Sequence, residues 1–313
     1  MKSTRRALDG VLLLDKDAGP SSNTALQRAK RLFNAAKAGH TGTLDPMATG
    51  LLPICFGEAT KFSSDLLNAD KVYDAVIALG TVTTTGDAEG TVVRRAAVQV
   101  SRKQVEAALA RFRGSIEQVP PMHSALKHQG RPLYAYAREG TEIVRAPRAV
   151  TIVRLDLVEF GGDLVHVEVA CSKGTYIRTL AADVGDALSC GGHLARLRRL
   201  RVGPLDLSAA TTLEALEQLD PVSRDALLQP VDSLVQTLPA VVLEAESARR
   251  FASGQVLRVP GCGATGEVRV YAAGRFVGVG TVEPEGTLAP RRLISTQVPL
   301  AAAIAPANER GIA

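Results

Sequence analysis

The segment from Gly39 to Gly50, GHTGTLDPMATG, contains the side chain best placed to do chemistry in this sequence. Asp45 precedes a proline, and a residue before proline is held extended rather than helical. Glycines and hydroxyl side chains surround Asp45, so a stiff loop could present its carboxylate to a substrate. An Asp-Pro pair is also common in ordinary turns, and the spacing alone favours a turn. The segment is not a Walker A loop, because no Gly-Lys-Ser/Thr follows at the required distance.

Two basic segments are candidates to bind phosphate groups. They hold Arg28, Lys30, Arg31, Lys37 and His40 in the first, and His193, Arg196, Arg198, Arg199 and Arg201 in the second. The net charge of +5 and the pI of about 9.1 favour an anionic partner, although each cluster alone is equally compatible with a solvated face. Aromatic residues make up only 4% and Trp is absent, which argues against a stacking platform for a long single strand.

The length and composition are those of an ordinary globular protein. With 313 residues, 46% hydrophobic and 22% charged, the chain is neither disordered nor collagen-like. No run approaches the ~18 apolar residues of a membrane span, and the N-terminus lacks the apolar core of a signal peptide. The four cysteines form no C-x-x-C pair, and Cys190 and His193 have no second pair with which to hold zinc. We therefore expect a cytoplasmic protein without a membrane span or a metal.

Hydrophobic periodicity predicts the elements that must position these residues. Strands are predicted over 10–15, 71–82, 149–158 and 163–171. Helices are predicted from Ser21 or Ser22 onward, from the Ser101–Gln104 capping box to Gly114, from Ile177 to Leu188, and from Thr211 to Leu219. Residues 38–60 and 115–148 show little regular period, and we expect 38–60 to be a loop.

The composition changes near residue 235. All nine lysines lie at or before Lys173, and beyond Pro239 short β patterns alternate with glycine in GEVRVYAAGRFVGVGTV. This predicts a larger domain over residues 1–235 and a small β domain over 239–313, both within the usual range of domain sizes. The final segment, AAAIAPANERGIA, is expected to be frayed.

Several blocks together resemble the tRNA pseudouridine synthase B family. The signature is GHTGTLDPMATGLLP around Asp45, and three further blocks agree in order: LLLDKDAGPSSN at 12–23, KVYDAVIALG at 71–80 and CSKGTYIRTLAADVGDALSCGGHLARLRR at 171–199. GEVRVYAAGRFVGVG, with APRRL at 289–293, resembles the PUA-type RNA-binding domain of that family. The resemblance covers nearly the whole chain. It implies an α/β (α+β) fold, with a mixed-sheet catalytic domain and a small C-terminal β-barrel.

The resemblance implies an isomerase that acts on uridine-55 in the T arm of tRNA without a cofactor. The bond to N1 is broken, the uracil is turned, and a bond to C5 is made. Asp45 is then the catalytic carboxylate, which attacks the base or the sugar or acts as a base. The expected partner is the T-arm stem-loop of tRNA, bound by a monomer with no obligate protein partner. Matching positions add the substrate-binding residues His40, Tyr73, Tyr176, Arg178 and Leu197. The candidates for RNA backbone contacts come from the second basic segment and from the first block, and they are Lys16, Arg196, Arg199 and Arg201.

Each of these roles has a plainer alternative. The target base must be flipped out of a stacked loop, and Tyr73 and Leu197 could pack on it, although both also suit a sheet core. Arg178 is expected to pair with Asp45 and to lower the pKa of that carboxyl, the alternative being a solvated arginine at a helix terminus. His40 would hold the RNA backbone or merely cap the loop. Lys16 would contact RNA or support the Asp45 loop.

One block departs from the family pattern and suggests a rival enzyme. The family often has Asp-Lys-Pro where this chain has Asp15-Lys16-Asp17, which puts the local turn in doubt. Asp15-x-Asp17 after a strand also mimics a haloacid-dehalogenase-type aspartyl phosphotransferase, but no ordered Lys and paired-acid block follows. Dependence on magnesium would distinguish that enzyme. A non-catalytic RNA-binding protein is the second rival, and it gives the Asp45 loop no purpose.

Overall fold

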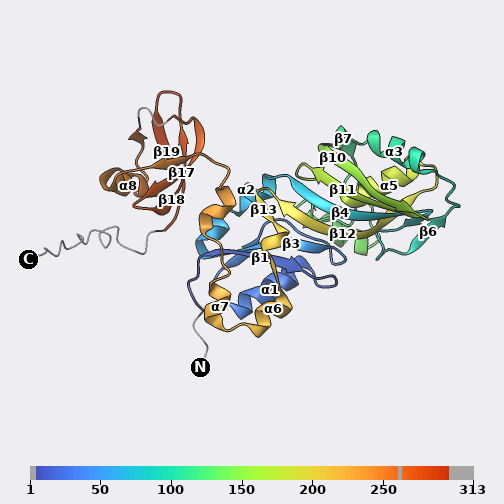
Figure 1. Ribbon diagram of the computed structural model, residues 1–313, viewed down its shortest axis with the longest axis horizontal. Helices are drawn as coiled ribbons and strands as arrows, with labels where there is room; N and C mark the ends of the chain where they lie inside the picture. The colour runs from blue at the N-terminus through green and yellow to red at the C-terminus, as the bar shows by residue number, and fades with distance from the viewer. Residues whose placement is uncertain (1–4, 260–262, 296–313) are drawn as a thin grey trace, which may run out of the picture.

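The computed structural model describes residues 5–259 and 263–295, which form a ten-stranded sheet and a separate five-stranded sheet (Figure 1). The strands of the larger sheet follow the order β14-β1-β3-β12-β4-β11-β10-β7, with β2 paired to β3 and β13 paired to β12. Only β1–β14 and β3–β12 pair in parallel, so the sheet is mixed, as predicted. Its strands are β1 (Gly10–Lys16), β2 (Ala38–His40), β3 (Thr49–Phe56), β4 (Lys71–Leu79), β7 (Gly114–Gln118), β10 (Arg148–Gly161), β11 (Leu164–Cys171), β12 (Gly192–Val202), β13 (Leu205–Asp206) and β14 (Thr211–Thr212).

Helices pack on one face of this sheet and form the main core. The side chain of Ser21 caps the first of them by accepting a hydrogen bond from Thr24 N, and the capping box predicted at Ser101 and Gln104 is present. The apolar stripes of these helices meet every second residue of the strands. The helices are α1 (Ser22–Leu32), α3 (Arg102–Ala110) and α5 (Ile177–Ala187), with the short α4 (Leu133–Arg138), α6 (Leu213–Gln218) and α7 (Pro221–Asp225) further along the chain.

The other face of the sheet is only half covered. Over β1 and β3 it packs on a second core, formed by short helices and turns of the 3-10 type. Over β12, β4, β11 and β10 the same face carries ion-paired side chains among apolar ones, such as Arg196 with Asp74 and Arg154 with Glu168. The covering elements are η1 (Gly57–Lys61), α2 (Ser63–Asn68), η2 (Leu207–Ala209) and η3 (Val231–Val235), and two small hairpins, β5 (Thr81–Thr83) with β6 (Val92–Arg95) and β8 (Lys127–His128) with β9 (Arg131–Pro132), extend the loops.

The expectation of a loop over 38–60 is wrong, because β2, β3 and η1 lie within it. β3 is buried on both faces, so its sequence shows no alternation of apolar and polar residues. Gly50 begins this strand with φ +97°, and a Cβ there would lie 2.3 Å from the carbonyl oxygen of Arg199. Only glycine allows two neighbouring strands to approach so closely at this point.

Two predicted helices are shorter than expected. The helix that starts at the Ser101 cap ends at Ala110, because Gly114 already begins β7. Thr211 and Thr212 pair with β1, which leaves Leu213–Gln218 for the helix. In both cases residues that were predicted at a helix end belong to a strand instead, Gly114 to β7 and Thr211 and Thr212 to β14.

The C-terminal unit is a curled five-stranded sheet with one helix. Its order is β15-β17-β18-β19-β16, and no pairing joins β15 to β16 within the described residues. The predicted barrel is therefore a half-barrel, consistent with a PUA-like domain. Its elements are β15 (Ala240–Val242), α8 (Ala245–Ala252), β16 (Leu257–Arg258), β17 (Gly266–Ala272), β18 (Arg275–Val282) and β19 (Thr287–Leu293). The segment predicted to be frayed lies outside the described residues, as does Cys262.

The two sheets share a core. The rings of Phe62 and Phe276 lie 5.4 Å apart, and both belong to the cluster that covers β1 and β3. Lys61 donates to the carbonyl of Leu293 at 3.0 Å, and Arg292 lies 3.4 Å from the carboxylate of Asp65. The C-terminal sheet is therefore packed directly against η1 and α2 rather than attached by a linker alone.

None of the helices in the described part of the chain has the length and apolar character needed to span a bilayer. Cys55, Cys171 and Cys190 are free thiols inside the protein.

Phe276→Ala tests the shared core. Phe276 is partly buried, so we expect a loss of about 2–3 kcal/mol, below the ~3–5 kcal/mol typical of a fully buried phenylalanine. The control is Val242→Ala, because Val242 is 74% exposed and its removal should cost little. The free energy of unfolding of both variants is measured in urea. Because the chain contains no Trp, unfolding is followed by far-ultraviolet circular dichroism. Unchanged stability of Phe276→Ala would show that the sheets do not depend on this contact.

Candidate active site

The loop that carries Asp45 is held on both sides by buried polar side chains. The hydroxyl of Ser22, at the start of α1, lies 2.8 Å from both the N–H and the carbonyl oxygen of Leu44. Lys16, at the end of β1, donates from Nζ to the carbonyl of Pro46 at 3.2 Å. The residues directly before and after Asp45 are thus fixed, which orients its carboxylate.

Lys16 serves the protein interior and not a phosphate. It is fully buried, and its ammonium also donates to the carbonyls of Asp17 at 2.8 Å and Pro20 at 2.9 Å. Three carbonyl partners use all three of its N–H bonds, and burial lowers the pKa of Lys16 to about 8. The expected RNA contact does not fit this position, whereas the support of the Asp45 loop does. Asp17, in place of the proline, follows β1 directly, and the chain bends at Ala18–Pro20.

A cavity of about 350 Å³ opens beside Asp45. This volume lies within the range of small-ligand sites. Asp45 is the only carboxylate among the described residues that line it. Six of the side chains predicted from the sequence share its wall, namely Asp45, Tyr73, Tyr176, Arg178, Leu197 and Arg199.

Arg178 pairs with Asp45 as predicted, but it is also held from behind. Its Nε lies 3.1 Å from Oδ2 of Asp45, and its Nη1 lies 3.6 Å from Oδ2 of Asp87. The same guanidinium donates to the carbonyls of Thr85 at 3.2 Å and His123 at 2.6 Å. Its side chain is 5% exposed, which excludes the alternative of a solvated arginine at a helix terminus.

The expected lowering of the Asp45 pKa is wrong. Burial raises the pKa of Asp45 above its ordinary value, and the charge of Asp87 acts in the same direction. Arg178 lowers that pKa, but by less than burial raises it. The guanidinium also lies 3.6 Å from Asp87, whose negative charge opposes the effect of Arg178 on Asp45.

The two tyrosines are held by backbone and sheet. Tyr73 lies on β4, and its pKa is raised by burial. Tyr176 immediately precedes α5, and the side-chain amide of Gln118 accepts from its N–H at 3.0 Å and donates to its carbonyl at 3.3 Å. Leu197 lies on β12, and it is 7% exposed at the edge of the main core. These side chains form apolar walls around the carboxylate.

His40 lies outside the cavity wall, whereas Arg199 is buried within it. His40 is on β2 outside the cavity wall, and its Nδ1 is buried without a hydrogen-bond partner among the described residues. Arg199 is 1% exposed and donates to the carbonyls of Leu51 at 2.8 Å and Gly42 at 3.1 Å. A phosphate contact by Arg199 does not fit this burial, because its guanidinium lies in the cavity wall and already donates to two backbone carbonyls.

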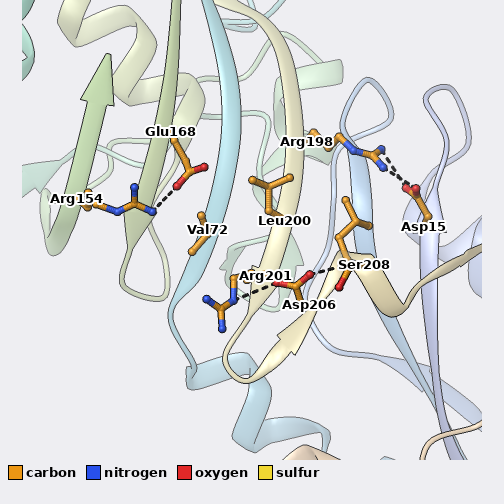
Figure 2. A pocket seen from close by; sticks show the side chains of 10 residues that line it. Asp15, Val72, Arg154, Glu168, Arg198, Leu200, Arg201, Asp206 and Ser208 are labelled. Atoms are coloured by element: carbon orange, nitrogen blue, oxygen red, sulfur yellow. Dashed lines mark hydrogen bonds and ion pairs between the residues drawn. The ribbon is translucent and has the colours of Figure 1, made fainter. Parts of the chain in front are cut away.

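Arg196 and Arg201 lie on the sheet face opposite the cavity. Arg196 is 3.4 Å from Asp74, and Arg201 is 3.4 Å from Asp206. Figure 2 shows the hollow of about 580 Å³ on that face, where Arg201 and Arg198 each meet a carboxylate, as does Arg154. Since every arginine in this view is paired with an acid, the larger hollow has no free charge to offer a ligand.

Asp87 belongs to the site but was missed by the sequence reasoning. It is 3% exposed, and its carboxylate accepts from the hydroxyl of Thr85 at 2.5 Å and from Glu89 N at 3.1 Å. Its turn lies between β5 and β6, in the sequence TTTGDAEG. A run of threonine, glycine and acid between strands could have marked it as an ordered polar turn.

Comparison with known proteins agrees with this geometry. Residues 30–177 match the TruB family pseudouridylate synthase N-terminal domain, residues 178–236 the tRNA pseudouridylate synthase B C-terminal domain, and residues 239–294 the pseudouridine synthase II TruB C-terminal domain. The tRNA pseudouridine synthase B of Dechloromonas aromatica is 57% identical over 293 residues, which cover 94% of this chain and 98% of that protein. That of Aromatoleum aromaticum is 58% identical over 292 residues, covering 93% and 94%.

A solved structure is similar over most of the chain. The matching chain in the crystal structure of a Cbf5-Nop10-Gar1 complex has a TM-score of 0.70 and 27% identity, covering 90% of this chain and 80% of that one. The family models match most of the chain, and relatives above half identity extend over nearly its whole length. The chain belongs to the TruB family of pseudouridylate synthases.

Proposed function

We propose that this protein converts uridine-55 in the T arm of tRNA to pseudouridine. The observation that carries the proposal is a single carboxylate, Asp45, anchored on both sides and facing a cavity with two tyrosines and a leucine. The curated relatives above half identity are tRNA pseudouridine synthases B. The cavity is large enough for one base, and residues of β4 and β12 form part of its wall.

The target uridine must leave its stacked position to reach Asp45, which costs a few kcal/mol. Tyr73 supplies an aromatic face for the flipped uracil, and Leu197 packs against it. The bond from C1′ to N1 breaks, the uracil turns within the cavity, and C1′ is joined to C5. C5 then loses its proton and N1 gains one, so the reaction is an isomerisation.

Asp45 acts at the centre of this exchange. Ionised, its carboxylate can serve as a nucleophile toward the sugar or the base, or as an acceptor for the proton from C5. Arg178 favours the ionised form, which burial and Asp87 oppose.

The remaining assignments concern the RNA outside the cavity. We propose that His40, beside the loop but outside the cavity wall, contacts the strand next to the flipped base. Residues 1–235 form the catalytic domain, and the PUA-like unit from 239 onward holds a part of the tRNA away from the target base. The protein is proposed to act as a monomer in the cytoplasm.

The phosphotransferase alternative is not favoured. Asp15 receives the guanidinium of Arg198 at 2.6 Å, on the sheet face opposite the cavity. A nucleophile needs a free carboxylate oxygen at an open site, and this one is neutralised by its neighbour.

Asp45→Asn should abolish pseudouridine formation because the amide keeps the shape and loses the charge. Binding of tRNA should remain within about tenfold, or ~1.4 kcal/mol. The control is Asp74→Asn on the opposite face, which should retain activity. Pseudouridine mapping in a T-arm stem-loop measures turnover. Activity in Asp45→Asn would remove Asp45 from catalysis, and an inactive wild type that still binds tRNA would favour a non-catalytic RNA-binding protein.

Arg178→Gln should move the acid limb of the kcat/KM profile to higher pH. The guanidinium lowers the pKa of Asp45, so its removal lets Asp45 take up a proton more readily. Stability should fall toward the lower end of ~3–5 kcal/mol, because Asp87 stays buried while Asp45 is 37% exposed. Arg178→Lys keeps the charge but loses the planar guanidinium, so we expect a large loss of activity and only a modest loss of stability.

A matched variant for this comparison is Arg198→Lys, which alters an arginine–carboxylate pair outside the cavity. Its pH profile should coincide with that of the wild type. A profile of Arg178→Gln that also coincides with wild type, at near-normal rates, would contradict the coupling of Arg178 to Asp45.

Replacing Arg196 and Arg201 together by Gln should leave the salt dependence of tRNA binding unchanged. Both are ion-paired and lie on the face opposite the cavity. If each contacts a phosphate, the slope of log K against log salt concentration would instead flatten by about two. Filter binding at several salt concentrations distinguishes the two results, and a flattened slope would place RNA on both faces of the sheet.

A further inference from the structure

Arg199 is a fully buried cation with no carboxylate partner among the described residues. It is 1% exposed and is the largest of the fully buried side chains. Burial lowers its pKa, and the interaction that most opposes this comes from Tyr73 and not from an acid. An unpaired buried charge costs several kcal/mol, so its retention in a stable fold requires an explanation.

The guanidinium joins three separate segments of the active site. Its Nε donates to the carbonyl of Leu51 on β3, and its Nη2 donates to the carbonyl of Gly42 in the Asp45 loop. Its third neighbour is Tyr73, whose side chain raises the pKa of Arg199 and so opposes the effect of burial. Tyr73 and Arg199 are also direct partners across β4 and β12.

The position of this side chain is set by the backbone. Gly50 approaches the N and O atoms of Arg199 so closely that a Cβ there would meet them at 2.7 and 2.3 Å. β3 and β12 are therefore held in close contact at the backbone of Arg199. A long flexible side chain is thus held in one place, which is what a positioning role needs.

The charges around the cavity are not balanced. Arg178 is matched by the carboxylates of Asp45 and Asp87. Arg199 and Lys71 also line the cavity, and neither has a carboxylate within ion-pair distance among residues 5–259 and 263–295. Lys71 donates to carbonyls at the end of α2, including Leu67 at 2.9 Å. The cavity wall therefore carries an excess of positive charge.

We propose that Arg199 is a positioning residue for the reaction, which fixes the Tyr73 hydroxyl and the Asp45 loop and whose unpaired charge favours negative charge on the uracil as its bond to C1′ breaks. The inference rests on the proposed function. Breaking that bond leaves the electron pair on the uracil, and a buried cation a short distance away stabilises this charge without moving. The same charge would be worth little in water.

The test compares Arg199→Gln and Arg199→Lys with Arg198→Gln. Arg198 is the next residue of the same strand, but it faces the opposite side of the sheet and pairs with Asp15. The single-turnover rate on a T-arm stem-loop and the dissociation constant are measured for each, with unfolding midpoints as a check on folding. Detection of pseudouridine with the wild type in the same assay separates this inference from the proposed function itself.

Arg199→Gln should lower the single-turnover rate by about 10²–10³, the usual loss for an oriented electrostatic group, with binding changed less than about threefold. Arg199→Lys keeps the charge but not the fork, so its loss should be about tenfold. Arg198→Gln should stay within about threefold of wild type. A folded Arg199→Gln, or Arg199→Lys if the first does not fold, with a rate within about threefold of wild type would overturn the proposal.

A double-variant cycle with Tyr73→Phe tests whether Arg199 acts through the hydroxyl. If it does, the loss in the double variant of Tyr73→Phe and Arg199→Lys should be smaller than the product of the two single losses, because the contact that the two residues share is already lost. Losses that multiply would show that Arg199 does not act through Tyr73, and would overturn the part of the proposal that concerns the Tyr73 hydroxyl.

Discussion

The ion pair between Arg178 and Asp45 is the interaction around which the site is arranged. It joins the start of α5 to a loop between β2 and β3, segments more than a hundred residues apart. The pair leaves the carboxylate only partly satisfied, because Asp87 competes for the same guanidinium and burial opposes the charge. A carboxylate in this state is more reactive than one held by a full set of hydrogen bonds, because fewer interactions must be broken when it contacts a substrate. The anchors on Leu44 and Pro46 are then needed to keep it from moving away.

Much of the fold could be predicted from periodicity, and the parts that could not share one cause. Strands with one polar face, such as β11, show apolar and polar residues in alternation. The start of α3 is marked in the sequence by its capping box. β3 is buried on both faces, so its sequence lacks the alternation of apolar and polar residues that would have distinguished it from a loop. The cavity residues came from family resemblance and not from spacing, because Tyr73 and Arg178 meet Asp45 only after the chain has folded. Asp87 carries no such signal, and its role depends on an arginine that is distant in sequence.

β12 explains why a cluster of basic residues was a poor guide to RNA contacts. Successive side chains of a strand point to opposite faces, so a run such as Arg198 and Arg199 is divided between the two sides of the sheet. Arg198 meets a carboxylate on one side, whereas Arg199 enters the cavity wall on the other. A bulge between Arg199 and Arg201 then returns Arg201 to the first side. The number of charges along the sequence does not show which face of the sheet each arginine lies on, whereas the register of the paired strands does.

The packing of Phe62 on Phe276 has a consequence for how RNA of different shapes is told apart. Because the C-terminal sheet packs directly against η1 and α2, this packing and not a linker alone sets its distance from Asp45. An RNA that touches both ends must present its target loop and its distant contact at one separation. Folded helices of the right length satisfy this spacing without adjustment, whereas unstructured strands must give up conformational freedom to do so. Selection among substrates can thus begin with overall shape, before any base is read.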